Sequence, residues 1–200
     1  MQFQCECGQF RAQIIHFPAN TPGRMMCYCD DCQTYLHHLG RADLLDPAGG
    51  TEIIPIYPSE IKILAGREKL KCTRLSPAGI FRWSTICCNT PVGNMRPKFP
   101  WMGLLERGFN VKEPRYLENT LGPIKNRILG KFARGTPPKG TSDKLEFKDM
   151  WVVLPFLLKG FLMGKSKNSP FFNSDAVTPI VAATVLSLEE RNAVRKKIGF

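Results

Sequence analysis

Three cysteines crowd into one stretch of the chain, Cys27-Tyr28-Cys29-Asp30-Asp31-Cys32. A cysteine that serves only as a small core residue does not need other thiols two and three positions away. A turn with the spacing C-x-C-x-x-C can bring three sulfur atoms to one point, at the roughly 2.3 Å that zinc–thiolate bonds require. Thiolates are soft ligands, which favours zinc over magnesium or calcium. The stretch therefore predicts a metal site, which we call the clasp: Cys27, Cys29 and Cys32.

Three sulfur ligands leave a tetrahedral zinc ion one ligand short. The fourth position can hold water or a substrate thiolate, as in catalytic sites, or be closed by a distant side chain, as in structural sites. His37 and His38 follow the clasp on a short predicted helix over residues 33–39, which Gly40 ends. Adjacent residues of a helix point about 100° apart, so at most one histidine could be the fourth ligand. We expect surface or packing roles for both.

A second group of thiols is expected around Cys5 and Cys7. Residues 3–14 alternate apolar and polar side chains, which predicts a hairpin, and Gly8 supplies the positive φ that its turn requires. Residues two apart on a strand share a face, so Cys5 and Cys7 supply half of a tetrahedral site. Cys72 stands alone in an alternating segment, and we expect it to be a core residue. All eight cysteines lie within the first 88 residues, mostly in tight groups, which favours reduced, metal-bound thiols over a secreted disulfide framework.

Cys87 and Cys88 are adjacent, and adjacent residues of an extended strand face opposite ways. Both sulfurs reach one ion only if the chain bends, and Asn89 and Pro91 favour such a bend. The sequence leaves open whether Cys87, Cys88 or both bind metal, and a strained vicinal disulfide is a further alternative. We therefore expect one or two Zn²⁺ ions. The candidate ligands are Cys5, Cys7, Cys27, Cys29, Cys32, Cys87 and Cys88.

Charge divides the chain near residue 95. Residues 1–95 carry nine Lys/Arg and eight Asp/Glu, whereas residues 96–200 carry 19 and nine, so the second part holds +10 of the net charge of +11. Short strand patterns separated by turns fill the first part, and helical patterns fill the second. We expect a mainly β fold, with a zinc-binding β module of several small antiparallel sheets over residues 1–95. A basic, largely helical extension over residues 96–200 is expected to pack on it.

Three helical patterns occur in the basic part. Residues 120–132 form an amphipathic pattern, residues 150–163 an apolar one that Ser142 or Asp143 could cap, and residues 187–198 begin with a capping box of Ser187 and Glu190. The apolar segment is shorter than the ~20 residues that a membrane span requires, so we expect a buried or interfacial helix. In the first part, Pro55 predicts an edge strand over residues 51–58.

The basic charge leaves the partner of this half open. A solvated surface, peripheral contact with an anionic membrane and binding of nucleic acid are all compatible with it. Nucleic acid is not expected, because the chain shows no recognition-helix or RNA-binding aromatic signature. We favour packing on the β module, which would bury Trp151, Phe156 and Phe161. The first residues contain no apolar leader, which predicts a cytoplasmic protein; the oligomeric state stays open.

Three ordered motifs together resemble the glutathione-dependent formaldehyde-activating enzyme / centromere protein V family. They are Cys-x-Cys-Gly near the start, Cys-x-Cys-x-x-Cys some twenty residues later, and a cysteine-rich turn before Asn89-Thr90-Pro91. The resemblance covers roughly residues 1–95. It implies a zinc-bound, all-β fold related to the Mss4-like fold, and carbon–sulfur lyase chemistry on glutathione adducts.

The resemblance also implies roles for single cysteines. Cys5, Cys7 and Cys88 match ligands of the family's structural zinc, and the clasp cysteines match the ligands of its catalytic zinc. The family usually has another cysteine three positions before the last ligand, where this chain has Thr85. Either Cys87 substitutes through a local bulge, or Cys88 serves alone and another group completes the site.

We therefore expect a zinc-dependent enzyme, a carbon–sulfur lyase that acts on a small thiol adduct of the glutathione type. A zinc ion at the clasp would bind the substrate sulfur as a thiolate, either as a nucleophile or as a leaving group. Three thiolates weaken the Lewis acidity of the ion, so the site suits sulfur transfer better than water activation. The alternative is a non-catalytic, zinc-stabilised binding module whose basic half contacts a membrane surface, nucleic acid or a protein partner.

Overall fold

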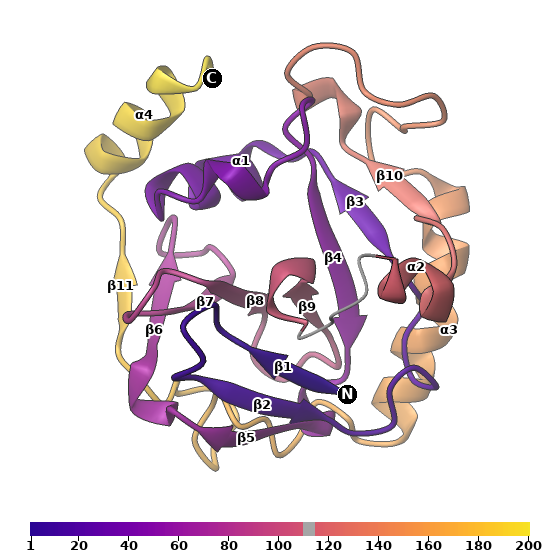
Figure 1. Ribbon diagram of the computed structural model, residues 1–200, viewed down its shortest axis with the longest axis vertical. Helices are drawn as coiled ribbons and strands as arrows, with labels where there is room; N and C mark the ends of the chain where they lie inside the picture. Colours follow the sequence, from indigo (N-terminus) through magenta and orange to yellow (C-terminus); the bar gives the residue numbers. More distant parts are fainter. Residues whose placement is uncertain (110–114) are drawn as a thin grey trace.

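The computed structural model describes residues 1–109 and 115–200. In this part of the chain the strands form two sheets, mostly antiparallel, with four α-helices around them (Figure 1). The expected mainly β class, with helices in the C-terminal part, is confirmed. The smaller sheet has the order β1-β2-β5, with β1 at Gln2–Gln4, β2 at Arg11–Ile14 and β5 at Ile61–Ala65.

The larger sheet has eight strands in the order β10-β3-β4-β9-β8-β7-β6-β11. Neighbours pair antiparallel except at the two ends, where β10 runs parallel to β3 and β11 runs parallel to β6. The bounds are β3 Met25–Cys27, β4 Thr51–Ile56, β6 Leu70–Arg74, β7 Phe81–Thr85, β8 Pro91–Met95, β9 Met102–Leu105, β10 Asn126–Ile128 and β11 Ala183–Val185.

This sheet crosses the division expected at residue 95, since β9, β10 and β11 all follow that residue. The hydrophobic core is shared in the same way. Trp83 of β7 is fully buried, and the ring of Phe171 packs 5.1 Å from it, centroid to centroid. The basic half therefore contributes both strands and core side chains to the β structure.

The α-helices are α1 Asp30–His38, α2 Tyr116–Leu121, α3 Phe147–Leu162 and α4 Leu188–Lys197. The capping box expected for the last helix is confirmed: Ser187 Oγ accepts from the amide of Glu190, and the Glu190 carboxylate accepts from the amide of Ser187. The cap expected for α3 is wrong. Glu146 and Asp149 form its capping box, whereas the amide of Ser142 donates to the carbonyl of Arg127 beside β10.

The helix expected over residues 120–132 is also wrong. Helix α2 ends before Gly122, whose φ of 75° stops it, and residues 126–128 form β10 instead. The amide of Lys125 donates to the carbonyl of Arg24, which begins the pairing with β3. A place at the edge of the sheet thus overrides the helical spacing of the apolar residues.

The strand with Pro55 is not at a sheet edge, because β4 lies between β3 and β9. The edge prediction is therefore wrong for the strand as a whole. Strand β3 pairs only with Thr51–Ile53, and Pro55 faces Gly103 of β9 on the other side. On the side of β4 that faces β3, no strand residue pairs with Pro55. The missing amide proton of proline therefore removes no ladder hydrogen bond on that side.

Helix α3 packs on the sheet through Phe156, whose ring stacks on Tyr57 with centroids 4.1 Å apart. The expected burial is right for Phe156 but wrong for Trp151 and Phe161, which are exposed. Each lies five residues from Phe156, about 140° around the helix, so the three side chains cannot share the inner face. Of the helices in the described ranges, none combines the length and apolar character needed to cross a bilayer.

Candidate metal centres

The sulfur atoms of Cys5, Cys7, Cys87 and Cys88 converge on one point, all within 4.8 Å of one another. Cys5 and Cys7 sit in the turn between β1 and β2, where Gly8 has a φ of 73° and its amide donates to the carbonyl of Cys5. The amide of Phe10 then donates to the Cys5 sulfur at 3.2 Å. The expected hairpin thus places both thiols on one side.

The turn between β7 and β8 brings in the other two sulfurs. Thr85 and Thr90 close it through a backbone hydrogen bond of 3.0 Å, and Asn89 adopts a φ of 51°. Because the chain bends here, the sulfurs of Cys87 and Cys88 both lie in the group, so both are placed where they could bind one metal ion. Their sulfurs lie 3.8 Å apart and all eight cysteines are free, so no vicinal disulfide forms.

Two hydroxyl groups set the state of Cys88. Its sulfur lies 3.1 Å from Thr90 Oγ1 and 3.5 Å from Thr85 Oγ1. Burial opposes ionisation, but hydrogen bonds from Thr85, Thr90 and Cys7 together lower the pKa of Cys88 to about 5. Thr85 therefore supports the group by a hydrogen bond.

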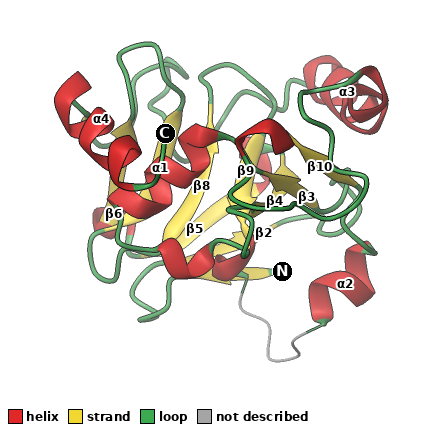
Figure 2. Cartoon of the chain, turned by 90° about the horizontal axis from the view of Figure 1, so that it is seen from above, coloured by secondary structure: helices red, strands yellow, loops and turns green. Residues whose placement is uncertain are grey.

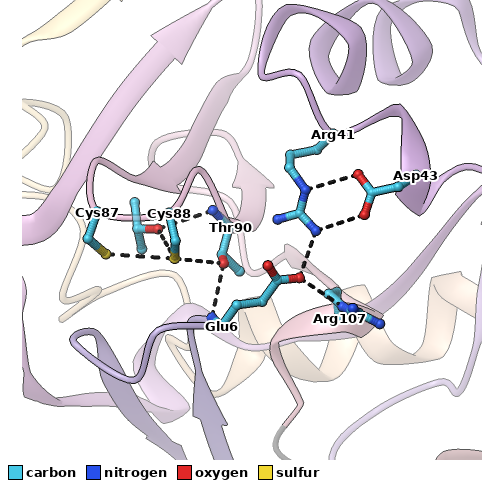
Figure 3. A network of polar contacts seen from close by, with 8 residues as sticks. Glu6, Arg41, Asp43, Cys87, Cys88, Thr90 and Arg107 are labelled. Carbon is cyan, nitrogen blue, oxygen red and sulfur yellow. Dashed lines mark hydrogen bonds and ion pairs between the residues drawn. The ribbon is translucent and has the colours of Figure 1, made fainter.

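A polar network ties this group to two other parts of the chain (Figure 3). The Thr90 hydroxyl accepts from the amide of Glu6, whose carboxylate accepts from Arg41 at 2.7 Å and from Arg107 at 2.9 Å. Arg41 also pairs with Asp43, just after α1. The network thus holds the Cys5–Cys7 turn against Arg41 and Arg107, which lie far from it in the sequence.

The clasp forms where β3 runs into α1. Cys27 ends β3, Cys29 is the N-cap of α1, and Cys32 lies in its first turn; the three sulfurs are within 4.8 Å of one another. The Cys29 sulfur accepts from the amide of Cys32 at 3.2 Å, in place of the usual capping oxygen. The expected convergence of these side chains is therefore present. Cys27 and Cys32 are buried, and Cys29 is half-buried.

A buried arginine lies against the clasp. Arg82 of β7 is 3% exposed, donates to the Cys32 sulfur at 3.8 Å and lies 3.9 Å from the Asp31 carboxylate. Hydrogen bonds from Cys27 and Cys29, together with the charge of Arg82, hold the pKa of Cys32 well below its usual value despite burial. Arg82 was not identified from the sequence. A charged residue between Phe81 and Trp83, in a predicted strand, is the signal that could have identified it.

Helix α4 contacts the N-terminal turn of α1. Arg195 donates to the carboxylates of Asp30 at 2.6 Å and Asp31 at 2.7 Å, the two acids between the clasp cysteines. Figure 1 shows the two helices side by side, with the C-terminus close to α1. The last helix of the basic half thus neutralises the acidic side chains next to the clasp.

The other candidates lie outside both groups. The ring of His37 contacts the guanidinium of Arg134 at 3.1 Å. Burial, and to a smaller extent the positive charge of Arg134, lowers the pKa of His37. His38 is exposed, and within the described residues neither histidine lies in either cysteine group. Cys72 is a core residue as expected, and burial raises its pKa to about 12.

The two groups differ in the number of ligands. The first offers four sulfurs, which complete a tetrahedral sphere, whereas the second offers three. Within residues 1–109 and 115–200, no histidine, aspartate, glutamate or further cysteine joins the clasp as a fourth ligand. Both groups could hold a metal ion, and only the clasp leaves a position for another ligand.

Comparisons with known proteins show the family of the chain. No curated protein matches it. A crystal structure of a Rhodobacter sphaeroides protein matches with a TM-score of 0.42 and 17% identity, over 62% of this chain and 97% of that chain. A family model matches residues 1–182, which include both cysteine groups and most of the basic half. The chain belongs to this family, DUF6151, a family of unknown function.

Proposed function

We propose that the protein is a zinc enzyme that binds a small thiol at the clasp and makes or breaks a carbon–sulfur bond of its adduct. The observation that carries this proposal is the contrast between a four-sulfur group and a three-sulfur group in one chain. Structural zinc sites are closed by four protein ligands, and catalytic ones keep a position open. The resemblance of the three cysteine motifs to the glutathione-dependent formaldehyde-activating enzyme family points to the same chemistry.

The sulfur separations fit zinc. A tetrahedral ion with zinc–sulfur bonds of about 2.3 Å places its sulfurs about 3.8 Å apart. The separation is 3.5 Å between Cys5 and Cys7, and 3.8 Å both between Cys5 and Cys87 and between Cys87 and Cys88. The clasp sulfurs fall within the same range of 4.8 Å. The separations of the four-sulfur group support zinc there, and the convergence of the clasp sulfurs is compatible with the same ion.

Charge balance at the clasp suits a sulfur ligand. A bound zinc ion would supply a Lewis-acidic position that stabilises a thiolate. The three clasp thiolates carry one negative charge more than a zinc dication neutralises, and the buried guanidinium of Arg82 offsets it. Arg82 is a positioning residue, because it acts through the Cys32 sulfur. Cys29 is the half-buried member of the clasp and marks the side from which a small thiol could approach.

The proposed step balances without a redox partner. In an S-hydroxyalkyl adduct of glutathione, the carbon–sulfur bond breaks, its electron pair stays on sulfur as a thiolate, and the hydroxyl proton leaves to solvent as the aldehyde forms. The reverse step forms the adduct. Neither direction needs an oxidant or a reductant, which fits a site built only from thiolates and an arginine.

The test uses the whole chain loaded with Co²⁺, whose absorption reports its sulfur ligands. Titration with glutathione should change the spectrum with one thiol bound per chain, in wild type and in the core control Cys72→Ala, but not in Cys29→Ser. Wild type should also accelerate exchange between an S-hydroxyalkyl adduct and free glutathione, followed by NMR. A spectrum that glutathione leaves unchanged would overturn thiol binding. Binding without accelerated exchange would overturn the lyase activity.

A specific observation favours a second candidate, a zinc-stabilised module without catalysis. Arg195 bridges Asp30 and Asp31 beside the clasp, and Cys27 and Cys32 are only 7% exposed each. If α4 keeps the site closed, both metals serve folding. The glutathione titration separates the two candidates, because a closed clasp would not respond to a thiol.

A further inference from the structure

Helix α3 carries apolar side chains on two faces. On the inner face, Phe156 is buried against Tyr57, and Gly160 lies against Tyr57 and Pro100. On the outer face, apolar side chains recur every three to four residues and are exposed, from 37% at the least to 88% at the most. These outer residues are Phe147, Trp151, Leu154, Leu158 and Leu162.

This outer face lies at the margin of the molecule. Figure 2 shows α3 nearly end-on at one corner of the fold. Phe161 and Met163 at its C-terminal end are also exposed, at 50% and 56%. A continuous apolar stripe on a surface helix is typical of a site that binds a membrane or another protein.

The charges around the stripe are positive. Residues 144–167 contain five lysines and two acidic residues. Neither acidic residue presents an unpaired carboxylate beside the outer face. Asp149 is buried in the helix cap, and Glu146 pairs with Lys148 at 2.9 Å. Lys159 remains exposed. The exposed lysines of the segment are Lys144, Lys148, Lys159 and Lys167.

We propose that this face is a peripheral membrane anchor that binds the surface of an anionic lipid bilayer. Trp and Phe side chains beside lysines are the composition of helices that lie in the membrane interface. Lysine is depleted at protein–protein interfaces, so the same ring of charge disfavours a protein partner. With 16 residues α3 is about 24 Å long, which is too short to span the ~30 Å hydrocarbon core but suits a helix in the plane of the interface.

A hollow beside the helix extends this surface. Its volume is about 250 Å³, and it lies between α3 and residues 19–22. Tyr57, Val152 and Phe156 supply apolar lining, and Lys159, which donates to Asn20 Oδ1, lines the hollow as well. The hollow thus repeats the pairing of apolar surface and cation that the helix presents, which suits part of a lipid with a phosphate headgroup.

The test uses the metal-loaded full chain and vesicles of phosphatidylcholine, with or without phosphatidylglycerol. Trp83 is buried and Trp101 half-buried, so a blue shift of fluorescence on binding reports Trp151. We expect co-sedimentation and a blue shift with the anionic vesicles, and loss of both as salt rises. Leu158→Glu should weaken binding roughly tenfold or more. Leu188→Glu, which changes another exposed leucine, in the first turn of α4, should not.

A second variant separates the lipid contact from its fluorescence report. Trp151→Phe should keep co-sedimentation but lose the blue shift. Absence of binding to anionic vesicles at low salt would overturn the proposal. So would equal weakening by Leu158→Glu and Leu188→Glu, or a dimer in solution that Leu158→Glu dissociates while vesicles do not bind.

Discussion

At the scale of single residues, Arg82 is a buried cation in contact with the clasp. It is buried, contacts the Cys32 sulfur and lies near Asp31. We expect Arg82→Met to lower the affinity of the clasp for zinc about 10- to 100-fold, because an outer-shell partner of a ligand is lost. Arg82→Lys keeps the charge and should retain part of the affinity.

Competition with a chelator measures this effect, with the four-sulfur group as an internal reference. The ion at the clasp should be released at a lower chelator concentration in Arg82→Met than in wild type, and the ion of the four-sulfur group should be released at the same concentration in both. Equal zinc affinities in wild type and Arg82→Met would show that the arginine only fills space in the core.

The two cysteine groups can also be separated one residue at a time. Cys88→Ser should lose one zinc ion and destabilise the fold by on the order of 5 kcal/mol, because a closed site couples its metal to folding. Cys29→Ser should lose the other ion and the response to glutathione. Native mass spectrometry counts the ions, and Cys72→Ala should retain both. Retention of both ions by Cys88→Ser would contradict a four-sulfur site.

Residue spacing predicts only part of these sites. The clasp could be predicted because its ligands lie within six residues. Arg82 could not, since it is 50 residues from Cys32 and its side chain reaches that sulfur only in the folded chain. The participation of both Cys87 and Cys88 depends on the φ of 51° at Asn89, which a sequence permits but does not require.

At the scale of elements, Arg195 joins α4 to the first turn of α1. Its two hydrogen bonds to Asp30 and Asp31 are partly buried, and we expect Arg195→Gln to cost about 1 kcal/mol. The larger effect should be on access, with faster alkylation of Cys29 in the metal-free chain and faster amide exchange in α4. Lys196→Gln, the exposed neighbour, serves as the control. Unchanged alkylation in Arg195→Gln would show that α4 does not restrict the clasp.

The docking of α3 depends on a glycine. A Cβ added at Gly160 would lie 2.6 Å from a ring carbon of Tyr57 and 2.7 Å from Pro100 Cβ. Gly160→Ala should therefore destabilise the protein by about 1–3 kcal/mol through overpacking. Thermal unfolding measures the change against Leu162→Ala, which alters an exposed position of the same helix. A stability equal to that of Leu162→Ala would mean that α3 can shift away from the sheet.

Elements with local signals were predicted correctly, and elements set by tertiary contacts were not. The Ser187–Glu190 capping box acts within four residues and marks α4. Strand β10 carries the apolar spacing of a helix, yet it pairs with β3, nearly one hundred residues earlier in the chain. The inner face of α3 likewise depends on Tyr57 and Pro100, which its own sequence does not reveal.

At the scale of the whole molecule, the neutral cysteine half and the basic half both contribute strands to the eight-stranded sheet. Strands β9, β10 and β11 come from the basic half, and α4 lies beside the clasp. The sequence could predict the β class and the charge asymmetry. It could not predict that the basic half completes the sheet and presents α3 outward, because both depend on long-range pairing.

The most direct test of the central claim is anomalous diffraction at the zinc edge, from crystals of the whole chain grown with zinc and soaked in glutathione. The account predicts two zinc ions. One should have four sulfur ligands, from Cys5, Cys7, Cys87 and Cys88, and the other should have three from the clasp and one from glutathione. A clasp without zinc, or one whose fourth ligand is a protein side chain in the presence of the thiol, would contradict it.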